Sequence, residues 1–158
     1  MATSAAQIRA FNGPALLSHG FRPFFLFGAL WAALAVALLL PMLSGHLIVP
    51  SAFAPIEWHV HELVYGYVPA IVAGFLLTAV PNWTGRLPVV GTRLLILFVT
   101  WIAGRVAVFS SLWIGAAMAT AIDLSFLALL GSVIAREIVA SKDARNLKVL
   151  AGVALLLV

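Results

Sequence analysis

Two histidines and a glutamate stand close together in the stretch WHVHE, residues 58–62. Imidazole nitrogens bind haem iron and copper, and a neighbouring carboxylate can orient the imidazole ring. The chain contains no cysteine, which excludes disulfides, iron–sulfur clusters and thiolate zinc sites within it. Histidine is therefore the natural metal ligand in this sequence, with His59 and His61 as first candidates and His46 and His19 as further ones.

The spacing within WHVHE limits how its histidines could share a metal ion. If Pro55 opens a helix, His59 and His61 point about 160° apart and cannot bind one ion. His59 would then share a side with Glu62, which would orient it as a ligand, while His61 would share a side with Tyr65 and serve a second centre or a neighbouring helix. An extended backbone would instead let both histidines face one metal, and interfacial polar anchors are the alternative to any metal site.

The segments that carry these residues are apolar enough to lie in lipid. Hydrophobic residues make up 64% of the 158 residues and charged residues 9%, against roughly 25% charged in an average soluble domain. A membrane-spanning helix needs about 20 apolar residues. We therefore predict an all-α, polytopic transmembrane helix bundle of about four full spans plus a truncated fifth, with spans near 24–43, 60–80, 94–109, 116–135 and 147–158. We expect residues 1–158 to form a single integral membrane domain, the N-terminal part of a longer polytopic protein.

Lysine and arginine alternate between the two sides of the predicted bundle. Two lie in the N-terminal segment 1–23 and none in the loop after the first span, followed by two, none and four in the next three connections. The positive-inside rule then places segment 1–23 in the cytoplasm and WHVHE at the outer end of the second span. The net charge of +4 is spread without a basic stripe, so the lipid bilayer rather than nucleic acid is the expected partner.

Two ionisable residues, Arg105 and Asp123, fall inside predicted spans, where an unpaired charge costs about 3 kcal/mol. Their similar depth in adjacent antiparallel spans predicts an intramembrane ion pair; a proton or anion path, or a clamp for a haem propionate, is the alternative. Small residues four apart mark helix faces that pack closely. Such a stripe runs through Gly66 to Glu62, and another reaches Asp123, so both carboxylates should face protein.

Two stretches resemble the NnrS family of bacterial membrane proteins: FRPFFLFGAL at 21–30 and WHVHELVYGYVPAIVAGFLLTAVPNWTG at 58–85. The resemblance implies a multi-pass protein of the bacterial inner (cytoplasmic) membrane that binds haem and copper, acts in the response to nitric oxide and nitrosative stress, and is associated with denitrification. It also implies partners in the remaining spans of the full-length protein and in nitric oxide or nitrosylated species. The family's WHxHE positions are Trp58, His59, His61 and Glu62, and its PNWTG positions are Pro81, Asn82, Trp83, Thr84 and Gly85.

The sequence departs from the family pattern at Leu63, where such proteins usually have methionine, a soft metal ligand. Asn82 and Trp83 lie some 30 Å from His59 by helix rise, so we interpret them as a helix terminus with an interfacial anchor. Two alternatives to a haem and copper protein remain: a proton-coupled secondary transporter using Glu62, Asp123 and Arg105, and a structural subunit without a centre of its own. The sequence shows neither an electron path nor a substrate pocket, and it leaves open whether the protein turns over a substrate.

Overall fold

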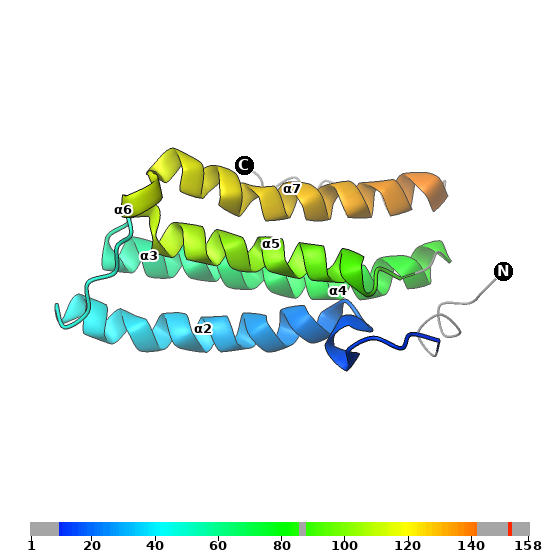
Figure 1. The fold of residues 1–158 in the computed structure, drawn as a ribbon, viewed down its shortest axis with the longest axis horizontal. Coiled ribbons are helices and arrows are strands. Elements are labelled where there is room, and N and C mark those ends of the chain that lie inside the picture. Colours follow the sequence, from blue (N-terminus) through cyan, green and yellow to red (C-terminus); the bar gives the residue numbers. More distant parts are fainter. Residues whose placement is uncertain (1–9, 86–87, 142–151, 153–158) are drawn as a thin grey trace.

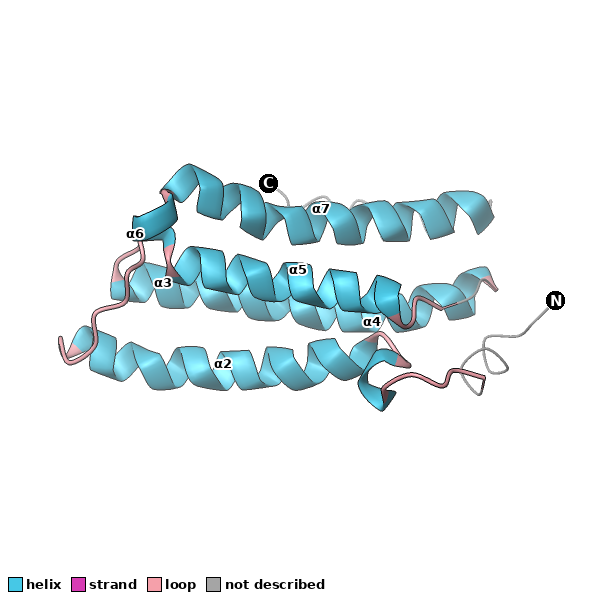
Figure 2. Ribbon diagram, in the orientation of Figure 1, coloured by secondary structure: helices cyan, strands magenta, loops and turns pink. Residues whose placement is uncertain are grey.

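The computed structural model describes residues 10–85, 88–141 and 152, and the first two of these ranges form a helical bundle without a strand. The described helices, in chain order, are the 3-10 turn η1 (Ala15–Leu17), α2 (Phe21–Leu43), α3 (Pro55–His61), the π-helical turn η2 (Glu62–Tyr67), α4 (Val68–Thr84), α5 (Thr92–Phe109), α6 (Ser111–Ile114) and α7 (Ala116–Ser141). Loops gather at the two ends of the bundle (Figure 2).

Four helices are long and apolar enough to cross a membrane: α2, the continuous helix α3–η2–α4, α5 and α7. They lie alongside one another with their axes along the length of the molecule (Figure 1). The predicted all-α bundle with four complete spans is therefore confirmed. The predicted fifth span, 147–158, lies outside the described residues except at position 152.

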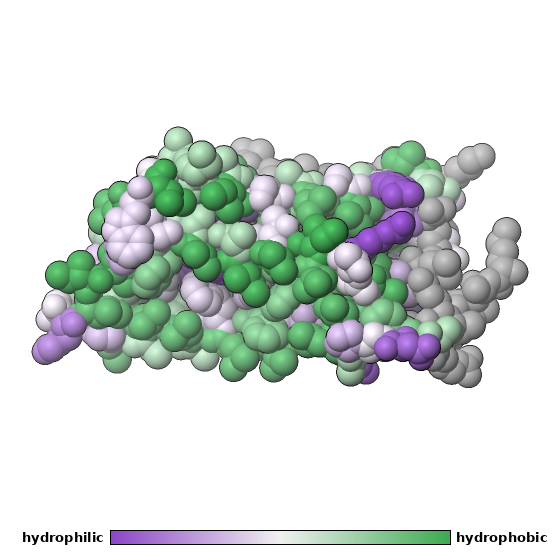
Figure 3. All heavy atoms as spheres, viewed as in Figure 1, coloured by the Kyte–Doolittle hydropathy of each residue, from purple (hydrophilic) through white to green (hydrophobic). Residues whose placement is uncertain are grey.

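The bundle is held by apolar packing between neighbouring helices, most extensively α5 with α7 and α2 with α4. Phe24 of α2 is fully buried and meets Phe98 and Trp101 of α5 edge-to-face, at ring-centroid distances of 6.0 and 6.5 Å. Such arrangements suit the opposite charges of an aromatic face and edge. The outward side chains are apolar as well, as Leu40 at 72% exposed illustrates, and green apolar surface covers most of Figure 3. Lipid is the solvent that such a surface matches.

The local sequence explains where the second spanning helix begins and ends. Pro55 occupies the first position of α3, where its missing N–H costs nothing. The backbone N–H of Ala54 donates to Glu57 Oε2 at 3.1 Å, which satisfies one group at the helix start. At the far end Gly85 adopts a φ of 66°, a left-handed conformation that favours glycine and terminates helices.

Candidate functional site

A buried cluster of charged side chains joins three of the spanning helices near the end that carries α3 and α6. Arg105 of α5 donates from Nη1 to Glu62 Oε2 at 2.9 Å and from Nη2 to Asp123 Oδ1 of α7. Glu62 is fully buried, and Arg105 and Asp123 are 3% and 6% exposed. Trp31 Nε1 of α2 donates to the same Glu62 oxygen at 2.7 Å. Both carboxylates face protein, and all four spanning helices contribute to this network.

Both terminal nitrogens of Arg105 are thus occupied by carboxylates. The sequence placed Arg105 against Asp123, and the structure brings them together while adding Glu62 as a second acceptor. Because the guanidinium is buried and already hydrogen-bonded at Nη1 and Nη2, its geometry does not favour a clamp for a haem propionate. The arrangement satisfies the condition for ionised groups in lipid, which is pairing within the protein.

Glu62 is positioned in this cluster by a π-helical turn. In η2 the N–H of Val68 bonds to the carbonyl of Leu63, five residues earlier, which widens the helix locally. Single π-turns are frequent at functional sites. Gly66 lies in the same turn; a Cβ there would overlap Nη1 of Arg105, so glycine leaves the space that the guanidinium fills. Its carbonyl also accepts a hydrogen bond of 2.8 Å from Trp101 Nε1 of α5.

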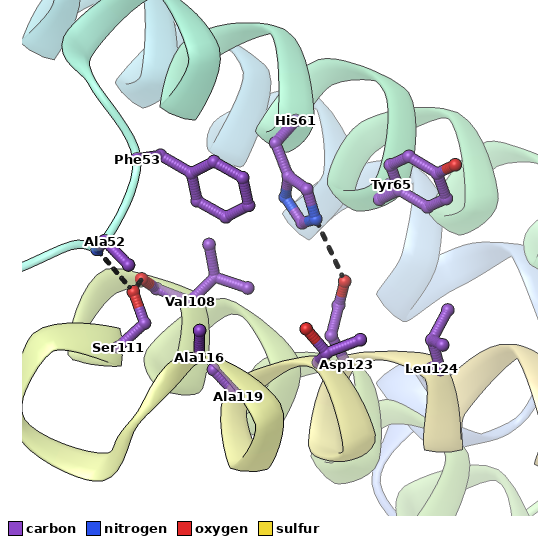
Figure 4. Close-up of a pocket in the computed structure, with 11 residues that line it drawn as sticks. Ala52, Phe53, His61, Tyr65, Val108, Ser111, Ala116, Ala119, Asp123 and Leu124 are labelled. Carbon is purple, nitrogen blue, oxygen red and sulfur yellow. Dashed lines mark hydrogen bonds and ion pairs between the residues drawn. The ribbon is translucent and has the colours of Figure 1, made fainter.

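His61 lies beside the charged cluster and at the wall of a cavity of about 440 Å³. Figure 4 shows its ring between the rings of Phe53 and Tyr65, with centroid distances of 5.0 and 5.1 Å. Nε2 lies 3.4 Å from Asp123 Oδ2, and Nδ1 lies 3.7 Å from Glu62 Oε1. Each imidazole nitrogen therefore faces a carboxylate. Nδ1 and Glu62 Oε1 are buried and have no hydrogen-bond partner among the described residues.

Two hydrogen bonds hold the loop after α2 in the position where Phe53 stacks on His61. The N–H of Ala52 donates to Ser111 Oγ at 2.8 Å, and the N–H of Leu112 donates to the carbonyl of Pro50 at 3.0 Å. Figure 4 shows the first of these contacts beside the cavity. The short helix α6 thereby fixes the loop residues that line one side of the cavity. Nothing in the sequence predicted this role for Ser111.

His59 has a different environment from His61. Its Nδ1 lies 3.1 Å from the carbonyl oxygen of Ala35 in α2. Since a carbonyl oxygen only accepts, Nδ1 carries the proton in the neutral ring, and Nε2 carries the lone pair that a metal would need. The ring is half-buried at the edge of the bundle. Its neighbour Trp58 is fully buried and packs edge-to-face against Trp31 at 6.4 Å.

The expectation that Glu62 orients His59 is wrong in this structure. Helical spacing predicted that the two residues share a side, and both do contact α2, but at different atoms. The carboxylate of Glu62 accepts hydrogen bonds from Arg105 and Trp31, whereas a backbone carbonyl orients His59. The attraction of a buried guanidinium for a carboxylate explains the difference. The expected contact between His61 and Tyr65, by contrast, is present as a stack.

The remaining histidines do not join these two. His46 is exposed in the turn after α2, with Nδ1 2.8 Å from Ser44 Oγ. His19 lies before α2 at the other end of the bundle, 2.9 Å from Ser18 Oγ; partial burial and the nearby Arg22 lower its pKa. Among residues 10–85 and 88–141, no three His, Asp or Glu side chains form a group suited to holding a metal ion.

Asn82 and Trp83 lie in the last turn of α4, far from the WHVHE end. Both are exposed, and Trp83 meets Phe75 edge-to-face at 6.0 Å. The helix ends one residue later, at Thr84. This placement agrees with a helix terminus that carries an interfacial aromatic anchor.

Comparison with protein families decides where the chain belongs. The model of the NnrS family, described as NnrS protein, matches residues 15–158. The chain belongs to the NnrS family. No curated protein and no solved structure matches it. The match covers every helix from η1 to α7, so the buried charged cluster, the cavity and both WHVHE histidines lie within the NnrS region.

Several residues of this NnrS site were missed by sequence reasoning. The sequence analysis gave no role to Trp31, Trp101 or Phe53, and the backbone carbonyl of Ala35 has no signal in the sequence. The indole N–H groups of Trp31 and Trp101 gave the best available hint, because a buried indole N–H needs an acceptor. Which acceptor each one finds depends on the packing of α2 and α5 against η2.

Proposed function

We propose that this chain acts in the bacterial response to nitric oxide and nitrosative stress, in association with denitrification, as a haem- and copper-binding protein of the inner membrane. We further propose that haem binds through Nε2 of His59. The observation that carries this assignment is the hydrogen bond between His59 Nδ1 and the Ala35 carbonyl. Membership of the NnrS family supports the role in the nitric oxide response.

His59 has three features that suit a residue that would hold haem iron. A single imidazole is enough to hold haem iron. A ligand histidine almost always donates its other N–H to a carbonyl or carboxylate, as Nδ1 does here. His59 is also half-buried and is not part of either cluster of buried core residues. Bound haem would supply a coordination position at which a diatomic molecule such as nitric oxide can bind.

Copper fits the described residues less well. A copper site with several protein ligands requires convergent imidazoles, and no such group exists in the described part of the chain. Both ring nitrogens of His61 face carboxylates. We therefore assign no complete copper site to these residues, and the copper proposal rests on the family resemblance.

The test is the optical spectrum and metal content of the complete protein, purified from a bacterial membrane. The proposal predicts a haem Soret band and iron bound close to one per chain, with a shift of that band when nitric oxide is added anaerobically. Copper is measured on the same sample by elemental analysis. A colourless, iron-free protein after expression with sufficient haem would contradict the proposal.

A second candidate function is a proton-coupled secondary transporter. The observation that favours it is the buried cluster of Glu62, Arg105 and Asp123 beside a cavity of about 440 Å³ lined by Asp123. Ionisable groups in this position often form proton or ion paths. Flux of a substrate into proteoliposomes, from protein without haem and sensitive to Asp123→Asn, would favour this function over the first.

A further inference from the structure

A groove of about 180 Å³ runs between α5 and α7 at the end of the bundle opposite the charged cluster. Arg93 from the first turn of α5 and Arg136 from the last turns of α7 line it at that end. Its other walls include Ile96 and Val133, one helical turn from these arginines toward the middle of the bundle, and Leu129 one turn deeper. The groove therefore has a basic end and an apolar trough.

The described residues at one end of this groove are mainly basic. Arg93 and Arg136 line it there, together with one acidic residue, Glu137. A single phosphodiester carries one negative charge and offers oxygen acceptors that guanidinium groups bind well. A phosphate group therefore suits the basic end of the groove, and a hydrocarbon chain suits the apolar trough.

The location of the groove in the bundle indicates that the phosphate belongs to a membrane lipid. Apolar side chains with exposed surface continue along α5 from Arg93, as Ile96 at 52% exposed shows, so the trough opens toward lipid. The basic end belongs to the side that carries the N-terminal segment, which the distribution of lysine and arginine predicts to be cytoplasmic. Basic pockets between spanning helices on that side are a recognised way of binding anionic lipid headgroups.

We propose that the groove between α5 and α7 binds one anionic phospholipid. The phosphate lies against Arg93 and Arg136, and an acyl chain lies along Ile96, Leu129 and Val133. A phosphatidylglycerol, whose headgroup has no positive charge, suits the two arginines of the groove. A phosphatidylcholine adds a fixed positive charge beside two arginines and should bind more weakly.

The test is native mass spectrometry of the detergent-purified protein, titrated separately with dioleoylphosphatidylglycerol and dioleoylphosphatidylcholine. The wild-type protein should bind phosphatidylglycerol on the order of tenfold more tightly, because each basic contact near a membrane contributes about fivefold to affinity. Arg93→Gln with Arg136→Gln should abolish this preference, and Arg93→Lys with Arg136→Lys should keep most of it. Arg22→Gln removes a charge at the same end of the bundle, from α2, and should leave the preference intact.

A second pair of variants tests the trough without changing any charge. Ile96→Trp fills the groove and should weaken binding of phosphatidylglycerol several-fold. Val99→Trp is the matched control: Val99 lies on the same helix and is 53% exposed, but it does not line the groove. Equal affinity for the two lipids, or a preference that survives the double glutamine variant, would overturn the proposal. Complete displacement by millimolar inorganic phosphate would also overturn it, because a free anion and not a lipid would then be the ligand.

Discussion

At the scale of single residues, the structure assigns different surroundings to the two histidines of WHVHE. His61 is enclosed by two aromatic rings and two carboxylates, so it belongs to the network of Glu62, Arg105 and Asp123. His59 lies outside that network and is oriented by a backbone carbonyl. Each carboxylate of the network accepts from Arg105, which makes this guanidinium the residue on which the buried charges depend.

Arg105→Ala should therefore destabilise the protein severely. Removing one partner from a buried ion pair typically costs about 3–5 kcal/mol, because the remaining charge is left uncompensated. Here two carboxylates would lose the guanidinium that offsets their charge, and Asp123→Asn in the same chain should restore part of the loss. The measurement is the free energy of unfolding in detergent micelles. Val106→Ala is the control: Val106 lies on the same helix and is 60% exposed, so its truncation should change this free energy by less than about 0.5 kcal/mol. If the losses in the double variant are simply additive, the two side chains do not interact.

At the scale of elements, the π-turn η2 is the feature that brings the site together. It carries Glu62 to Arg105, and its Gly66 accepts from Trp101 through the carbonyl while leaving room for the guanidinium. The stripe of small residues that runs through Gly66 thus has two effects: it lets helices pack closely, and it leaves space for a charged side chain. A larger side chain at Gly66 would compete with Arg105 for the same space.

Gly66→Ala should lower the free energy of unfolding by about 1–3 kcal/mol, the usual cost of inserting a methyl group into a filled site. Val64→Ala is the matched control, since Val64 lies in the same turn and is 44% exposed. It should cost less than about 1 kcal/mol. Thermal unfolding of both variants under one detergent condition makes the comparison, and equal losses would show that the space at Gly66 is not critical.

The sequence was sufficient to predict the four spanning helices and part of the site. Apolar runs determine the spanning helices, Pro55 determines where the second begins, and the cost of unpaired charge in lipid placed Arg105 with Asp123. The sequence was insufficient where a choice depended on three-dimensional packing. Several side chains could have donated a hydrogen bond to Glu62. The packing of α2 and α5 against η2 determines that Trp31 and Arg105 do so and that His59 does not. The π-turn has no residue signature of its own, so ideal α-helical angles could not describe η2.

At the scale of the whole molecule, the two ends of the bundle differ in chemistry. The end with α3 and α6 holds the buried charges and the cavity. The opposite end holds the exposed arginines Arg93 and Arg136 and, in Figure 1, the start of α2. The alternation of lysine and arginine along the chain predicts that this second end faces the cytoplasm. WHVHE would then lie at the outer face of the membrane.

Single cysteines test this orientation directly, because the chain contains none of its own. Ile48 is 88% exposed in the loop after α2, and Thr92 is exposed at the start of α5. In intact bacterial cells with a permeable outer membrane, an impermeant maleimide should label Ile48→Cys and not Thr92→Cys. Both should react after the inner membrane is broken. The reverse pattern in intact cells would place WHVHE at the cytoplasmic face.

The central claim is that His59, and not His61, binds haem, and the haem content of two variants tests it most directly. His59→Ala and His61→Ala are purified in parallel from the complete protein, with circular dichroism to verify that each keeps its helix content. The Soret absorbance per chain is then compared with that of the wild-type protein. We predict that His59→Ala loses most of this absorbance while His61→Ala retains it. Full haem content in His59→Ala, or loss of haem from His61→Ala alone, would contradict the claim.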